Sequence, residues 1–79
     1  MKTAYLISSI EEYGKFIAYC IDNDICVWRT YWDEKNVFSI NWLEKRCYYS
    51  SKQYYISNGY EIKTPKFEID EYGKYKIKE

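Results

Sequence analysis

The chain has 79 residues, with 12 basic and 12 acidic side chains and no His. This length predicts one domain, residues 1–79, with a modest core, and a hydrophobic content of 47% excludes a disordered chain. Zero net charge excludes a broad electrostatic attraction to nucleic acid or to an anionic membrane. Because no apolar run approaches the roughly 18 residues of a membrane helix, we expect no membrane partner.

The N-terminal third predicts a strand followed by a helix. Residues 3–7 (TAYLI) are rich in aromatic and branched side chains, which favours a short strand. Ser9 and Glu12 then fit the S-x-x-E capping box that begins many helices. Apolar residues follow within one arc of a helical wheel, so we expect an amphipathic helix over about 10–22.

The face that this helix buries also follows from the wheel. Ile10, Ile17 and Ile21 lie on one side, and we expect them to pack on the sheet. An alternative is a hairpin of 16–21 with 25–31, because the motif EYGK followed by an aromatic residue occurs at both 12–16 and 71–75. The nearly continuous apolar run after Lys15 lacks the alternation of a half-buried strand, so the pattern favours the helix.

The rest of the chain carries strand patterns. Residues 37–43 alternate, with Phe38, Ile40 and Trp42 on one face that we expect to be buried. Asn58-Gly59 is a strong signal for a two-residue hairpin, and the last hairpin would turn at 71–73, with 73–79 as a frayed end. The strands are expected at residues 25–32, 37–43, 46–49, 54–56, 60–62, 67–69 and 74–78.

This order predicts an α+β fold. One helix would lie on one face of a curled antiparallel sheet of about four to six strands; the alternative is a small all-β barrel. Because no second helix is expected, the other sheet face would stay uncovered. Some of the eleven tyrosines and three tryptophans would then be exposed.

Catalytic and metal-binding patterns are missing from the sequence. Without His, the commonest general base and metal ligand is absent. The adjacent carboxylates of Glu11 and Glu12 would point about 100° apart on a helix and cannot face each other. Cys20, Cys26 and Cys47 form no CxxC pair, so we expect reduced packing thiols rather than a zinc site. We therefore predict a protein that is not an enzyme and has no cofactor or metal.

The surplus of aromatic side chains instead indicates binding. Tyr and Trp, together with Arg, are the residue types that dominate protein interfaces. On a strand over 25–32, Trp28 and Trp32 would share one face, and Arg29 and Tyr31 the other; the pattern leaves open which face is exposed. Packing of these rings within the sheet is the alternative. The candidate interface residues are Trp28, Arg29, Tyr31, Trp32, Tyr48, Tyr49, Tyr54, Tyr55 and Tyr60.

A single-stranded nucleic acid is the second candidate partner. Residues 46–55 interleave tyrosines with Arg46 and Lys52, so bases could stack on the rings while phosphates meet the cations. Alternate lysines at 74–78 would add charge on one side of a strand. A pocket for a small nucleotide signal is a third alternative.

The layout resembles small uncharacterised proteins of phages and prophages of low-GC bacteria. The shared features are a strand, an S-x-E-E helix start, a strand with Trp-Arg, pairs of tyrosines and a closing Gly-Tyr-Glu-Ile. Few alanines and one proline beside many Ile, Lys and Tyr agree with A/T-rich codons. The matching residues are Ser9, Glu11, Glu12, Trp28, Arg29, Tyr48, Tyr49, Tyr54, Tyr55, Gly59, Tyr60, Glu61 and Ile62.

What the resemblance implies is a non-enzymatic inhibitor of a host protein. We expect a phage or mobile-element protein that acts in the host cell cytoplasm on a component of anti-phage defence, in the manner of an anti-CRISPR inhibitor. The first residues, MKTAYLISSIEEYG, do not fit a signal peptide, which agrees with this location. A homodimer that buries the uncovered sheet face is a further expectation.

Overall fold

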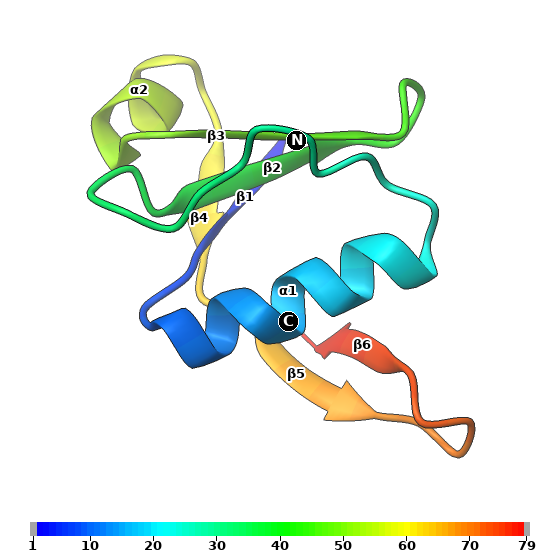
Figure 1. Cartoon of the computed structure of the whole chain (residues 1–79). Helices are drawn as coiled ribbons and strands as arrows, with labels where there is room; N and C mark the ends of the chain where they lie inside the picture. The colour runs from blue at the N-terminus through cyan, green and yellow to red at the C-terminus, as the bar shows by residue number, and fades with distance from the viewer. Residues whose placement is uncertain (1, 79) are drawn as a thin grey trace.

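The computed structural model describes residues 2–78 and confirms the α+β class (Figure 1). The structure has a four-stranded sheet, a main helix, a short second helix and a two-stranded sheet, and the strands do not close into a barrel. The elements are β1 (Thr3–Leu6), α1 (Ile10–Asp22), β2 (Val37–Asn41), β3 (Arg46–Ser50), α2 (Lys52–Ser57), β4 (Glu61–Lys63), β5 (Lys66–Ile69) and β6 (Tyr75–Lys78).

The four-stranded sheet has the order β3-β2-β1-β4. Its first three strands are antiparallel neighbours, but β4 runs parallel to β1, with Ala4 opposite Ile62. The expectation of a wholly antiparallel sheet is therefore wrong at this edge. The reason is the connection: the chain leaves β3, passes through α2 and crosses to the far side of β1, and a crossover through a helix joins parallel strands.

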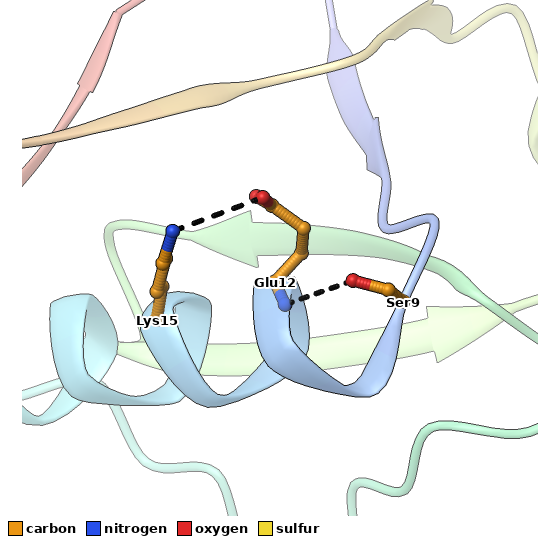
Figure 2. Close-up of polar contacts among 3 residues, drawn as sticks. All are labelled: Ser9, Glu12 and Lys15. Atoms are coloured by element: carbon orange, nitrogen blue, oxygen red, sulfur yellow. Dashed lines mark hydrogen bonds and ion pairs between the residues drawn. The ribbon is translucent and has the colours of Figure 1, made fainter.

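The first helix begins and ends where the sequence predicts. Ser9 is the N-cap, and its Oγ accepts a hydrogen bond from the Glu12 backbone N–H at 3.2 Å (Figure 2). The Glu12 carboxylate lies toward the ammonium of Lys15, 4.0 Å away. At the other end Asp24 has a φ of 58°, and the N–H of Ile25 donates to the Cys20 carbonyl at 2.8 Å. This left-handed residue and backward hydrogen bond form a Schellman ending.

The buried face of α1 agrees with the prediction at Ile17, which packs against the main core, and differs at Ile10 and Ile21. Ile10 and Ile21 are 61% and 59% exposed, whereas Phe16 and Cys20 are fully buried. The reason is that α1 lies between two layers, the four-stranded sheet on one side and the β5–β6 hairpin on the other (Figure 1). The Phe16 ring reaches both layers, with its centroid 5.3 Å from that of Phe38 and 6.5 Å from that of Phe67.

The final hairpin forms as expected, but as a separate sheet. Strands β5 and β6 pair antiparallel from Lys66↔Lys78 to Ile69↔Tyr75. Asp70 holds the turn, because its Oδ1 accepts from the backbone N–H groups of Tyr72 and Lys74 at 2.8 and 3.0 Å. Residues 75–78 of the tail that we expected to be frayed are thus a paired strand, and residue 79 lies outside the described residues.

The predicted strand over 25–32 is wrong. Among the described residues this segment makes one isolated bridge, Cys26 with Arg46, and then turns. Arg29 has a φ of 64°, which no strand residue adopts, and the Thr30 N–H donates to the Val27 carbonyl at 3.1 Å. The segment is fixed by side chains instead, since the Trp32 indole N–H donates to the Ile7 carbonyl at 2.8 Å.

The predicted hairpin around Asn58-Gly59 is also wrong. Residues 52–57 form α2, whose N-cap Ser51 accepts from the Tyr54 N–H at 3.2 Å. Asn58 and Gly59 end this helix, and the Tyr60 N–H donates to the Tyr55 carbonyl at 3.0 Å in a second Schellman ending. Gly59 has a φ of 78°, a conformation that both a hairpin turn and a helix ending require, so the same dipeptide suits either.

Candidate protein-binding surface

The two faces of the four-stranded sheet are covered unequally. Alternation places Tyr5, Phe38 and Ile40 toward α1, and Ala4 and Ser39 on the opposite face, where α2 lies. Helix α2 has six residues and covers one end of that face (Figure 1). We call this second side the α2 face. Its exposed part is the surface on which aromatic side chains gather.

Tyr55 is the side chain that attaches α2 to the sheet. It is 2% exposed and packs with Ala4 and Val37. Its hydroxyl makes a hydrogen bond of 2.9 Å with the buried hydroxyl of Ser39. Burial raises the pKa of Tyr55 to about 12, so the phenol stays neutral. Tyr55 therefore supports the surface from beneath and does not face a partner.

A groove lies above Tyr55 on the α2 face. Its volume is about 350 Å³, and we call it the tyrosine groove. Tyr48 and Tyr54 on its walls are 44% and 53% exposed. The groove is lined by Ser39, Tyr48, Tyr49, Ser50, Tyr54, Tyr55 and Tyr60.

The rings of the tyrosine groove are held in place by their neighbours. Tyr55 contacts Tyr54 and Tyr60 edge to face, with centroids 5.4 and 4.8 Å apart. The Tyr48 hydroxyl donates to Glu44 Oε1 at 2.7 Å, and this bond to a carboxylate raises the pKa of Tyr48 above its usual value. These contacts restrict the rings, so contact with another molecule would cost little further side-chain entropy.

A second hollow adjoins the tyrosine groove at the outer edge of β3. It measures about 400 Å³ and lies between the 28–30 turn and residues 46–49. Trp28 is 68% exposed, with the Arg29 guanidinium 6.0 Å from its ring centre. The two hollows share Tyr48 and Tyr49, so Trp28 and Arg29 continue the same surface.

The two candidates outside both hollows are Trp32 and Tyr31, and Tyr31 is 61% exposed. Trp32 is half-buried in the main core and bonds to the Ile7 carbonyl. Tyr49 stacks on Phe38 with centroids 5.8 Å apart, and Tyr31 packs against Tyr49 edge to face at 6.3 Å. The structure therefore brings Tyr48, Tyr54, Tyr55 and Tyr60 together at the tyrosine groove. Tyr49 lines it too, although its ring stacks on Phe38 on the α1 side, and Trp28 and Arg29 lie beside it.

Trp42 lies on the α1 side with Phe38 and Ile40, as predicted, but it is not buried. Strand β2 ends at Asn41, whose Oδ1 accepts from the backbone N–H groups of Leu43 and Glu44 at 3.1 and 3.0 Å. This turn exposes Trp42, which keeps an edge-to-face contact with Tyr19 at 6.4 Å and has the Lys45 ammonium 5.4 Å from its ring centre. The Asn41 side chain was the signal that the strand stops early.

The three cysteines lie close together in the fold. Cys20 and Cys47 are buried in the main core, while Cys26 is exposed. The pKa of Cys47 lies far above its usual range, because its thiol is hydrogen-bonded to Cys20 and is buried. The Cys47 thiol therefore stays protonated. Within residues 2–78, no cluster of three or more Cys, Asp or Glu side chains has a geometry that could hold a metal ion.

The chain matches no protein family, no curated protein and no solved structure. No helix in the described part of the chain has both the length and the apolar character needed to cross a membrane.

Proposed function

We propose that this is a non-enzymatic protein that binds a protein partner through the α2 face. The observation that carries the proposal is the tyrosine groove, in which Tyr54 and Tyr60 contact buried Tyr55 and the Tyr48 hydroxyl bonds to Glu44. Exposed Tyr, Trp and Arg that are fixed in position have the composition of an interface hot spot. Trp28 and Arg29 extend this surface across the edge of β3.

The lysines of 74–78 are separated from the tyrosine groove, whereas Arg46 lines the adjoining hollow and Lys52 lies on α2. Lys74, Lys76 and Lys78 lie in and beside β6, and β6 lies on the other side of α1 from the four-stranded sheet and α2 (Figure 1). The basic row and the tyrosines that would stack on bases are therefore on different sides of the molecule.

In the organism we propose the role of an inhibitor. The likeness to small phage and prophage proteins and the A/T-rich residue usage support an origin in a phage or mobile element of a low-GC bacterium. A small domain whose exposed rings gather on one face can act by covering a working surface of a host protein, including a component of anti-phage defence. A second copy of the chain could cover the same face, which solution mass would reveal.

Capture from a low-GC host lysate, followed by binding measurements with the purified partner, tests the proposal. We expect Tyr48→Ala combined with Tyr54→Ala to weaken partner binding at least thirtyfold, because hot-spot residues each contribute ~2 kcal/mol or more. Tyr72→Ala is the matched control, since Tyr72 is exposed on the β5–β6 turn, away from the groove.

Two results would contradict this function. One is a partner that binds wild type and the double variant equally well. The other is binding of a single-stranded oligonucleotide whose affinity falls steeply with salt, on a log–log slope of several units, which would favour the nucleic-acid alternative.

A further inference from the structure

Strand β3 forms an open edge of the four-stranded sheet. In the order β3-β2-β1-β4, it has one strand neighbour, β2, with which it pairs along its full length. The hollow of about 400 Å³ between the 28–30 turn and residues 46–49 lies at the outer side of β3, and we call it the edge hollow. A strand at a sheet edge presents unpaired backbone groups, to which another chain can add.

The hydrogen bonds of Cys26 show which backbone groups of β3 point outward. The Cys26 N–H donates to the Lys45 carbonyl at 2.8 Å, and the Cys47 N–H donates to the Cys26 carbonyl at 2.9 Å. Cys47 therefore directs its N–H and C=O away from β2. Because the backbone of a strand alternates with a period of two, Tyr49 directs its N–H and C=O the same way. Within residues 2–78 these two groups of Tyr49 have no hydrogen-bond partner.

The segment after the bridge to β3 leaves this edge and turns toward α1. The Thr30 N–H donates to the Val27 carbonyl at 3.1 Å, and Arg29 between them has a φ of 64°. The Thr30 carbonyl then accepts from the Tyr13 hydroxyl of α1 at 3.0 Å. The segment thus bridges β3 at one residue, and the position beside the backbone of Tyr49 stays open.

The side chains at the edge hollow differ between the two faces of the sheet. Tyr48 is opposite Ser39 in the ladder, so Tyr48 and Arg46 face the α2 side. Tyr49 faces the α1 side, where its ring stacks on Phe38 with centroids 5.8 Å apart. An added strand would therefore meet a cation and a hydroxyl group on one face and an aromatic ring on the other.

The edge hollow carries positive charge although the chain as a whole is neutral. Among the described residues that line it, the charged ones are Arg29 and Arg46. Both are exposed, and neither forms an ion pair within residues 2–78. Glu44 contacts one lining residue, Tyr48, whose hydroxyl donates to it at 2.7 Å. The two guanidinium groups can therefore accept a carboxylate of a partner without first breaking an ion pair.

The backbone pattern at this edge favours a peptide over a nucleic acid. Tyr49 presents both a donor and an acceptor, and the backbone of an extended peptide has the complementary acceptor and donor. A phosphate supplies acceptors alone, so it would leave the Tyr49 carbonyl without a donor. The edge therefore matches another polypeptide strand.

We propose that the outer edge of β3 binds an extended segment of the protein partner as an added strand, with acidic side chains beside Arg46 and apolar side chains beside the Tyr49 ring. The alternation follows from the period of two in a strand, which sends successive side chains to opposite faces. The acidic preference follows from the charges of Arg29 and Arg46. This inference rests on the proposed function and specifies the part of the partner that is recognised.

Two blocked hexapeptides test the inference, one alternating valine with glutamate and one alternating valine with lysine. We expect the glutamate peptide to move the amide proton signal of Tyr49 downfield in NMR spectra and to bind about tenfold more tightly than the lysine peptide. Arg46→Glu should reverse this preference. Lys76→Glu is the matched control and should keep it, because Lys76 is exposed on β6, on the other side of α1 from the four-stranded sheet.

A backbone substitution distinguishes strand addition from attraction between charges alone. Tyr49→Pro removes the outward N–H, and proline is tolerated on an edge strand where the N–H faces solvent. Tyr49→Ala removes the same ring but keeps the N–H. Once thermal melting shows that both variants are folded, we expect the glutamate peptide to bind the proline variant about tenfold more weakly than the alanine variant. The Arg46→Glu test remains decisive if the proline variant does not fold.

The outcomes separate this inference from the proposed function. Absence of glutamate-peptide binding at ~1 mM, a Tyr49 amide signal that does not move, or equal binding by the two folded Tyr49 variants would overturn the edge as a binding site. A partner that still depends on Tyr48 and Tyr54 would leave the proposed function standing in that case. A dimer of the chain, or a bound single-stranded oligonucleotide, that moves the Tyr49 amide signal would reject the partner segment as the occupant of the edge.

Discussion

The hydrogen bond between Ser39 and Tyr55 is the contact that joins α2 to the sheet, and its removal has a calculable effect. Both residues are buried, and the two hydroxyl oxygens are 2.9 Å apart. Tyr55→Phe keeps the ring and its packing but leaves the Ser39 hydroxyl without its partner in a dry position. A buried polar group left without a partner costs ~1–3 kcal/mol.

We expect Tyr55→Phe to lower the free energy of unfolding by about 1–2 kcal/mol. For a domain of this size each kcal/mol changes the Tm by ~4–8 °C, so the Tm should fall by ~5–15 °C. Ser39→Ala should cost a similar amount, because it leaves the Tyr55 hydroxyl unpaired. The double variant removes both hydroxyls, so its loss should be smaller than the sum of the single losses by ~1 kcal/mol.

Urea denaturation followed by tryptophan fluorescence measures all four proteins of this double-mutant cycle. Tyr54→Phe is the control, because Tyr54 is exposed on the same helix and should stay within ~0.5 kcal/mol of wild type. Strictly additive losses, or a Tyr55→Phe variant as stable as wild type, would refute the reasoning that this bond holds α2 on the sheet.

Three further predictions concern pH, backbone conformation and thiol access. Since the pKa of Tyr55 is raised from 10.0 to about 12 in the folded protein, the unfolded chain ionises first. Stability should therefore fall as the pH rises from about 10 to about 12, and less so in Tyr55→Phe, as urea midpoints would show. Gly14→Ala should stabilise the protein by ~0.5–1 kcal/mol, because Gly14 is helical and a Cβ there meets open space. Gly59→Ala should destabilise it by ~1 kcal/mol, because Gly59 has a φ of +78°. Thermal melts in which both substitutions change the stability in the same direction would contradict this. Iodoacetamide should modify exposed Cys26 within minutes in the native state, and mass spectrometry should find buried Cys20 and Cys47 modified only on unfolding.

The features that the sequence predicts well are those set by neighbours along the chain. The bounds of α1 follow from Ser9 as N-cap, the helical spacing of apolar residues and the Asp22-Asn23-Asp24 ending, all within one segment. The hairpin of β5 and β6 likewise depends on Asp70 and Gly73 at its own turn. Such local hydrogen bonds and dihedral preferences can be predicted without knowing which elements pack against the segment.

The errors occur where one local pattern serves two structures. Asn58-Gly59 supplies a positive φ that ends a helix as readily as it turns a hairpin. Ser51 begins α2 as its N-cap, and the helix is favoured over the hairpin because it buries Tyr55 against the sheet. Aromatic residues at 25–32 favour a strand, but the chain there is fixed by the distant bond from Trp32 to Ile7.

The sequence by itself determined an aromatic-rich α+β domain without His and the position of its main helix. Only the tertiary structure decided which rings are exposed, because the crossover through α2 buries Tyr55 and leaves Tyr48 and Tyr54 at the surface. It also decided that β4 pairs parallel to β1, on the opposite side of β1 from β2. Both outcomes depend on contacts between segments far apart in the chain, and neither has a signature in any one segment.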